Sequence, residues 1–125
     1  MIARLDHLVL TVEDIEASVA FYVGALGMRH ETFGAGRHAL RFGDAKINLH
    51  QRGREFSPRA ATPTPGSADL CFVSDVPVAE VAARLATLGI AVEEGPVPRT
   101  GATGPILSIY VRDPDRNLVE ISNYA

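Results

Sequence analysis

The chain of 125 residues is 46% hydrophobic and 22% charged, which is typical of one globular domain and excludes an intrinsically disordered chain. Its net charge of −3 gives no electrostatic basis for binding nucleic acid or an anionic membrane, so neither is expected as a partner. The single cysteine excludes an intrachain disulfide and fits a reducing compartment. We find neither a secretory signal pattern nor an apolar run of about 18 residues, so we expect a soluble, cytoplasmic protein.

The first half of the chain predicts one strand, one helix and three further strands. Residues 5–12 are rich in β-forming side chains and lead into an acidic dipeptide that suits the start of a helix. Residues 15–26 place apolar side chains along one helical face, and Gly27 suits the end of that helix. Turns that contain glycine then separate three short strands, expected near residues 29–33, 38–42 and 46–50.

The second half of the chain repeats the pattern of the first. A shift of 62 residues places His7 on Asp69 in a strand, and the same shift places Gly27 on Gly89 at a helix end. Any two strand–helix units look somewhat alike, but one offset that aligns both features indicates a duplication. Between the halves, residues 52–67 are rich in proline, glycine and serine and are expected to form a linker.

We therefore predict an α+β fold for a single domain over residues 1–125. Two βαβββ modules, approximately residues 1–51 and 68–125, would form one curved mixed β-sheet cleft with the helices on its outer face.

The alternation of side chains along each strand predicts a cluster of polar residues on the face away from the helices. Apolar residues at every second position mark the helix-packed side of the first, fourth, fifth and last strands. The opposite side of these strands carries His7, His50 or Asn48, Asp69, and Glu120. Two imidazoles and two carboxylates on one concave surface would suit Fe(II), Mn(II), Ni(II) or Zn(II). The alternative is that each residue is a satisfied strand histidine or a solvated carboxylate.

The fourth strand leaves two candidates for a ligand. An internal offset of 70 residues equates His50 with Glu120, whereas an offset of 72 equates Asn48 with it. Strand parity permits both, and we favour His50 because imidazole is the better metal ligand.

Two motifs at the ends of the chain resemble a known family. The opening RLDHLVLTVEDIEASVAFYVGALGM is similar to the first βα unit of the vicinal oxygen chelate (glyoxalase/bleomycin resistance/dioxygenase) superfamily. The closing DPDRNLVEISNY resembles that family's DPDGxxxE ending, whose glutamate is a metal ligand. The stretches KINLH, PRAATPTPGS and GPVPRTGATGPILSIYVRDPDRNLVEISNY resemble short glyoxalase-domain-containing and biphenyl-2,3-diol dioxygenase-related proteins most closely.

The resemblance implies a divalent-metal-dependent enzyme that chelates two neighbouring oxygens of a small substrate. His7 and Glu120 would be metal ligands, and Glu120 would also be the catalytic residue. Asp69 stands where the family usually has histidine, and together with His50 it would complete or flank the set of ligands. The reaction implied is that of a ring-cleaving dioxygenase or of a glyoxalase-like lyase or isomerase, which the fold alone does not select.

Two further expectations come with the resemblance. The alternative function is a non-catalytic protein that binds and sequesters a small molecule, as bleomycin-resistance members do. The expected assembly is a homodimer, because related proteins dimerise and because open sheet edges and apolar helix surface require covering.

Overall fold

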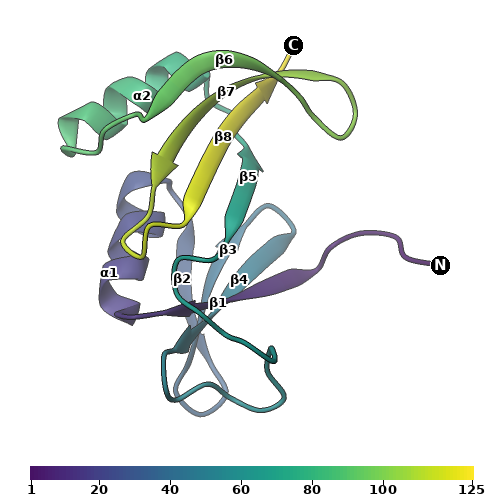
Figure 1. Ribbon diagram of the computed structural model, residues 1–125, viewed down its shortest axis with the longest axis vertical. Helices are drawn as coiled ribbons and strands as arrows, with labels where there is room; N and C mark the ends of the chain where they lie inside the picture. The colour runs from purple at the N-terminus through teal and green to yellow at the C-terminus, as the bar shows by residue number, and fades with distance from the viewer. The chain divides into compact units, whose positions relative to one another are not determined.

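The computed structural model describes residues 1–125, which divide into two compact units, Met1–Ser67 and Ala68–Ala125. Each unit contains a strand, a helical segment and three further strands (Figure 1), so the predicted order βαβββ is confirmed in both halves. The stretch predicted as a linker, residues 52–67, belongs to the first unit.

The first unit is a four-stranded mixed sheet with one helical segment. Its strands lie in the order β1-β4-β3-β2, with β1 parallel to β4 and the other neighbours antiparallel. Alternating apolar residues bury one face of this sheet, which α1 contacts through β4. The elements are β1 (His7–Val12), α1 (Ile15–Val19), η1 (Ala20–Ala25), β2 (Arg29–Phe33), β3 (Arg37–Phe42) and β4 (Ala45–Gln51).

The helical segment of the first unit begins and ends where its sequence predicts. The Asp14 side chain accepts a hydrogen bond from the Ala17 backbone N–H at 3.3 Å and so caps the first turn of α1. The α-helix continues as the π-helix η1, which buries Tyr22 completely. Gly27 then takes a φ of +76°, a left-handed conformation that glycine adopts without steric cost, and ends the helix.

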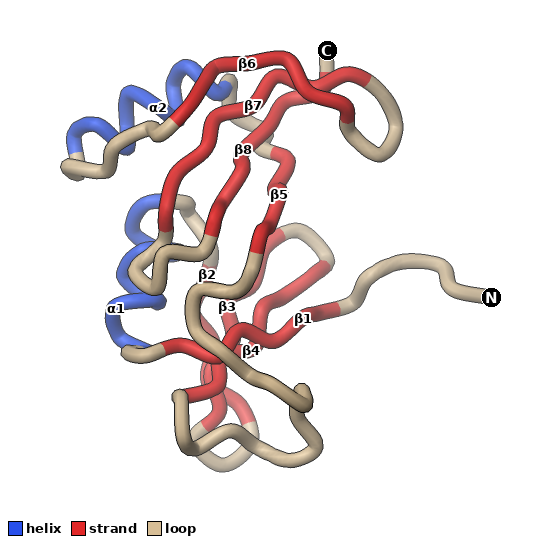
Figure 2. The backbone as a smooth tube through the Cα atoms, in the orientation of Figure 1, coloured by secondary structure: helices blue, strands red, loops and turns tan.

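The second unit repeats this topology. Its strand order is β5-β8-β7-β6, with β5 parallel to β8 and the remaining neighbours antiparallel. Figure 2 shows α2 lying along this sheet, and Val78 and Leu85 of the helix are buried. The elements are β5 (Asp69–Val73), α2 (Val78–Thr87), β6 (Glu94–Thr100), β7 (Pro105–Arg112) and β8 (Leu118–Tyr124).

Two local features fix α2 to its sheet. The Asn123 side chain on β8 accepts a hydrogen bond from the Val78 backbone N–H at 2.7 Å and thereby satisfies the start of the helix. Gly89 ends the helix with a φ of +73°, close to that of Gly27. The 62-residue repeat is therefore a structural duplication down to its helix ends. The strands form two four-stranded mixed sheets, one in each unit, in agreement with the predicted α+β fold of two βαβββ modules.

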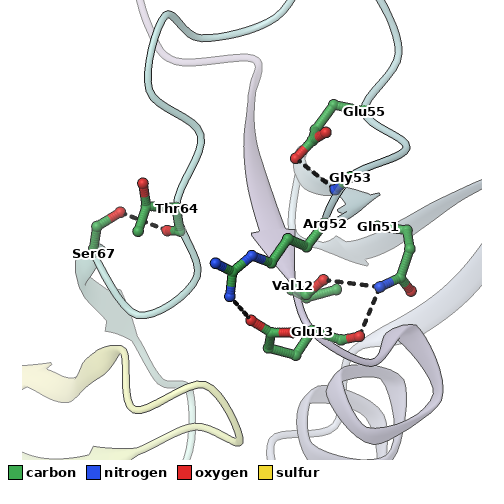
Figure 3. A network of polar contacts seen from close by, with 8 residues as sticks. All are labelled: Val12, Glu13, Gln51, Arg52, Gly53, Glu55, Thr64 and Ser67. Carbon is green, nitrogen blue, oxygen red and sulfur yellow. Dashed lines mark hydrogen bonds and ion pairs between the residues drawn. The ribbon is translucent and has the colours of Figure 1, made fainter.

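Polar contacts tie the end of β4 to the end of β1 (Figure 3). The Gln51 amide donates hydrogen bonds to the backbone oxygens of Val12 at 3.4 Å and Glu13 at 2.7 Å. The Arg52 guanidinium pairs with the Glu13 carboxylate. These contacts fix the start of the segment that leaves β4. No helix of the chain is long and apolar enough to cross a membrane.

Candidate functional site

His7 begins β1 and presents an exposed imidazole. Its Nδ1 lies 2.7 Å from the Asp6 carboxylate, which can only accept, so Nδ1 carries the proton and donates it. This hydrogen bond lowers the pKa of Asp6. A neutral imidazole held in this way offers the Nε2 lone pair, and a carboxylate on the other nitrogen is the usual arrangement behind a metal-bound histidine.

The β1–β4 register separates the two candidate histidines. His7 lies opposite Lys46, whereas His50 lies opposite Thr11, four residues further along the ladder. Four residues of parallel strand span about 13 Å, and both side chains stand roughly perpendicular to the sheet. The first unit therefore does not bring His7 and His50 together.

The same register distinguishes the two candidates on β4. Val9 pairs with Asn48, and in the second unit Cys71 pairs with Glu120. Since the 62-residue shift equates Val9 with Cys71, Asn48 occupies the position of Glu120. His50 then corresponds to Ser122, so the offset of 72 is the structural one.

Asn48 and His50 are both more than nine-tenths buried, although they lie on the polar face of β4. Neither the Asn48 Oδ1 atom nor the His50 Nε2 atom has a hydrogen-bond partner. The Phe56 ring contacts the His50 ring edge to face, with centroids 5.5 Å apart. Burial, followed by the positive charge of Arg37, lowers the pKa of His50.

Glu120 lies on β8 within a hydrogen-bonded group on the polar face of the second sheet. The Ser108 hydroxyl donates to Glu120 Oε2 at 2.6 Å, and the Ser108 and Ser122 hydroxyl oxygens are 2.7 Å apart. Ser122 Oγ is also 3.4 Å from Glu120 Oε2. These contacts orient the carboxylate through its Oε2 atom.

Asp69 shares this polar face, on the neighbouring strand. It is exposed and pairs with Leu118, two residues along the ladder from the Cys71–Glu120 pair. Cys71 lies directly opposite Glu120 and two residues from Asp69 along β5, and burial raises the pKa of its thiol. A thiol with a raised pKa is a poor nucleophile at neutral pH. The second unit thus places both candidate carboxylates on one face.

Each residue fits a divalent ion by its donor atom, but neither unit alone assembles a complete ligand set. Imidazole nitrogen and carboxylate oxygen are donors that suit Fe(II), Mn(II), Ni(II) and Zn(II). His7 and Glu120 each have one nitrogen or oxygen oriented by a hydrogen bond to a neighbour. No group of three or more histidine, cysteine, aspartate or glutamate side chains is gathered closely enough to hold an ion.

Sequence reasoning missed the residues that hold the candidates in place. Asp6 adjoins His7, and Ser108 lies across the ladder from Ser122. The parity of β7 could have identified Ser108, because it shares a face with Tyr110. Nothing in the sequence pointed to Phe56, which lies in an irregular segment after β4.

A pair of histidines that the sequence left without partners lies on β2 and β3. His30 Nε2 and His38 Nδ1 are 2.9 Å apart, with the rings stacked at an interplanar angle of 9°. They lie on the helix-packed side of the first sheet, since His30 pairs with Leu40 and His38 with Leu49. They are therefore separate from the polar face.

Comparison with known proteins gives matches along nearly the whole chain. The sequence profile of the Glyoxalase/Bleomycin resistance protein/Dioxygenase superfamily matches residues 4–121. Virulence protein STM3117 of Salmonella typhimurium is 56% identical over 124 residues, 99% of this chain and 86% of that protein. Its crystal structure covers 100% of this chain and 99% of its own, with a TM-score of 0.98. The glyoxalase domain-containing protein RDO1 of Mycosarcoma maydis is 57% identical over 123 residues, 98% of this chain and 69% of that protein.

More distant solved structures share the fold at 24% identity. Lactoylglutathione lyase from Agrobacterium tumefaciens has a TM-score of 0.74 over 98% of this chain and 95% of its own. TnmS3, an antibiotic binding protein from Streptomyces sp. CB03234, has a TM-score of 0.79 over 99% of this chain and 98% of its own. The same fold therefore hosts a lyase and a binding protein, so the site has to decide the function.

Proposed function

Because the chain belongs to the Glyoxalase/Bleomycin resistance protein/Dioxygenase superfamily, we propose that it is a divalent-metal-dependent enzyme acting on a small substrate. His7 and Glu120 are the proposed ligands, Asp69 is a further candidate, and His50 flanks the set. Glu120 is also the proposed catalytic residue. The bound ion would act as a Lewis acid on two neighbouring oxygens of the substrate.

One observation carries this proposal. In both proposed ligands a neighbour orients one donor atom by a hydrogen bond: Asp6 orients His7, and Ser108 orients Glu120. An oriented donor loses less conformational entropy when it binds an ion, which favours affinity.

The reaction stays within the range of the superfamily, as a ring-cleaving dioxygenase or a glyoxalase-like lyase or isomerase. One feature of the chain is compatible with either reaction, namely a carboxylate that could act as a general base. Glu120 keeps a carboxylate oxygen that can accept a proton, and the Ser108 hydroxyl donates to the other oxygen. A carboxylate so placed can serve as a general base.

The second candidate function is a protein that binds a small molecule without turnover. It is favoured by one specific observation, that no group of three potential ligands is gathered. TnmS3, which shares the fold, is described as an antibiotic binding protein. Metal binding separates the two candidates.

The test is calorimetric titration of the EDTA-treated protein with Mn(II), Ni(II) and Zn(II). The His30–His38 pair presents two close imidazole nitrogens of its own, so all titrations use the background His30→Ala/His38→Ala. In that background, His7→Ala or Glu120→Gln should weaken binding more than about 100-fold, because each removes a direct ligand. Asp6→Ala, which removes only the residue that orients His7, should weaken it about 10–100-fold.

Two results would overturn the proposal in favour of the binding protein. One is a background protein that binds none of the three ions. The other is a folded His7→Ala or Glu120→Gln protein with undiminished affinity. Asp44→Ala, a change in an exposed turn of the first unit, is the control and should bind as the background does.

We also propose that the chain forms a homodimer. Each sheet ends in two edge strands, and closed symmetric pairs are the commonest way to cover such edges. Light scattering should then give twice the chain mass of 13.4 kDa. A mass of one chain at tens of micromolar would refute the dimer.

A further inference from the structure

The polar face of the first unit holds two hydrogen-bonding groups that nothing in the chain satisfies. Asn48 is 6% exposed and His50 is 3% exposed, and Asn48 Oδ1 and His50 Nε2 are without partners. Leaving a buried polar atom unpaired costs about 1–3 kcal/mol, so two on one strand require an explanation. At the matching positions of the second unit, Glu120 and Ser122 are hydrogen-bonded.

The surroundings of the pair combine aromatic rings with positive charge. The Arg37 guanidinium lies 4.7 Å from the centroid of the Phe56 ring and 5.1 Å from that of Phe33. The Phe56 ring also contacts the His50 ring. Arg59 also acts on His50 as a positive charge, while Glu55 opposes it. Because the aromatic rings are apolar and the nearby charges are positive on balance, these surroundings disfavour a cationic ligand.

The two atoms restrict the chemistry of what can bind them. Asn48 Oδ1 can only accept, so its partner has to be an O–H or N–H group. The His50 Nε2 atom donates or accepts according to the tautomer of the imidazole. A hydroxyl group donates and accepts at once, and it carries no positive charge.

We propose that Asn48 and His50 form a substrate-anchoring site that binds a hydroxyl group of a neutral or anionic, hydroxylated small molecule. The hydroxyl donates to Asn48 Oδ1 and completes the hydrogen bonding of His50 Nε2. The inference rests on the proposed function and deepens it, since it names a chemical feature of the substrate. It also gives His50 a role other than that of a direct metal ligand.

The segment after β4 carries Phe56, whose ring contacts His50. Gln51 and Arg52 are held to the end of β1 (Figure 3), and the Gly53 N–H donates to the Glu55 carboxylate at 3.2 Å. The start of the segment that carries Phe56 is therefore fixed.

The test uses EDTA-treated protein and two matched pairs of probes, each differing by one hydroxyl. L-lactate is compared with propionate, and 3-hydroxybenzoate with benzoate, at up to about 50 mM, a range that covers the weak affinities of such small molecules. The readout is the long-range ¹H–¹⁵N spectrum of the His50 imidazole. The hydroxylated member of at least one pair should shift the His50 Nε2 resonance, and its plain partner should not. The responding pair distinguishes an aliphatic from an aromatic substrate.

A variant sharpens the result. Asn48→Leu removes the acceptor and should weaken binding of the responding probe about 10-fold, the effect of one hydrogen bond. His38→Ala, which removes a histidine on the other face of the sheet, should bind that probe normally. The wild-type comparison of paired probes needs no variant, so a misfolded Asn48→Leu protein does not weaken the test.

The inference is overturned if no hydroxylated probe shifts His50, or if both members of each pair shift it equally. It is also overturned if Asn48→Leu folds and binds as well as the wild type. A bound water that bridges the two side chains, with no effect of any probe, is a further contradicting result. Because the protein is metal-free here, failure leaves the metal titration intact, and failure of that titration leaves this test intact.

Discussion

The two units have the same strand topology but carry different polar side chains at equivalent positions of their sheets. In the second unit, Glu120 and Ser122 on β8 are hydrogen-bonded with Ser108 on β7. The ladders put Asn48 and His50 of the first unit at the positions of Glu120 and Ser122. There the second unit satisfies its own polar groups, whereas the first leaves Asn48 Oδ1 and His50 Nε2 unpaired.

The two units also differ in net charge. The first unit has eight lysine and arginine residues against seven aspartate and glutamate residues, a net charge of +1. The second has four against eight, a net charge of −4, and the two sum to the chain's −3. The duplication therefore preserved the backbone frame and left each half free to specialise. Carboxylate chemistry lies in the second unit, and imidazole with cationic chemistry lies in the first.

The largest predicted effect concerns the outer strands β6 and β2, because the two units differ there in strand pairing. The β6–β7 ladder has a register shift between Glu94 and Val97, and β2–β3 has none. Within the shift, Gly95 has a φ of +110°, and an added Cβ would lie 2.4 Å from the Ser108 backbone oxygen. Gly95→Ala should cost about 3 kcal/mol or more in the free energy of unfolding, because strain and overpacking add.

Chemical denaturation with urea measures this cost, with Gly24→Ala as the control. Gly24 lies in η1 with no atom within 4 Å of an added Cβ, so its substitution should be neutral or slightly stabilising. Equal stability of the Gly95→Ala and wild-type proteins would show that the shift in β6 is tolerant of side chains.

The second effect compares the turns that lead into β8 and β4. Asp113 is buried, and its carboxylate accepts from the backbone N–H groups of Asp115 and Asn117, each at 2.9 Å, and from the Asn117 amide at 2.8 Å. Asp113→Ala should destabilise the protein by about 2–3 kcal/mol, because three donors lose their partner. Asp44→Ala, in the exposed turn before β4, should change stability by less than about 0.5 kcal/mol.

The midpoints of thermal unfolding of the two variants check this contrast. Similar midpoints would mean that the Asp113 network contributes no more than an exposed turn. The network would then not be what fixes the start of β8.

The third effect is a pH dependence that belongs to the first unit. The pKa of His50 is lowered in the folded protein, so below about pH 6.5 the unfolded chain binds a proton that the folded chain resists. Stability is therefore greatest above that pH and falls as the solution is acidified through the histidine range. His50→Gln should flatten the curve of unfolding free energy against pH between about 5 and 7. A wild-type curve with the same slope as the variant would contradict the burial of a neutral His50.

The smallest effect concerns the turn residue Arg116, which has a left-handed φ of +72°. Arg116→Gly removes a conformational cost of about 1–2 kcal/mol but adds chain entropy to the unfolded state, so a gain of about 0.5 kcal/mol is expected. Arg116→Ala keeps the unfavourable φ and should give no gain. Equal stabilities of the two variants in urea would show that the effect comes from the lost arginine side chain.

The strands and helix ends could be predicted from the sequence because they depend on periodic and local signals. Alternating apolar residues marked β1 and β8, and Gly27 and Gly89 marked the helix ends. The sequence could not decide whether Asn48 or His50 is equivalent to Glu120, because the alternation of side chains gives the face of a strand but not its pairing register. Only the Val9–Asn48 pairing equates Asn48 with Glu120.

The contacts of residues outside the strands and helices could not be predicted from the sequence either. Phe56 packs on His50 from an irregular segment, and a contact of this kind has no spacing rule. The metal ligands stay a prediction from the sequence, with the orientation of His7 and Glu120 as their support.

The most direct test of the proposed metal chemistry is paramagnetic broadening of the backbone amide spectrum by substoichiometric Mn(II) in the His30→Ala/His38→Ala background. If His7 and Glu120 bind one ion, the amides of Leu8 and Ile121 should broaden in parallel as Mn(II) is added. The amide of Ala82, in the middle of α2, should change far less. Broadening of only one of the two groups, or of neither, would contradict an ion shared by His7 and Glu120.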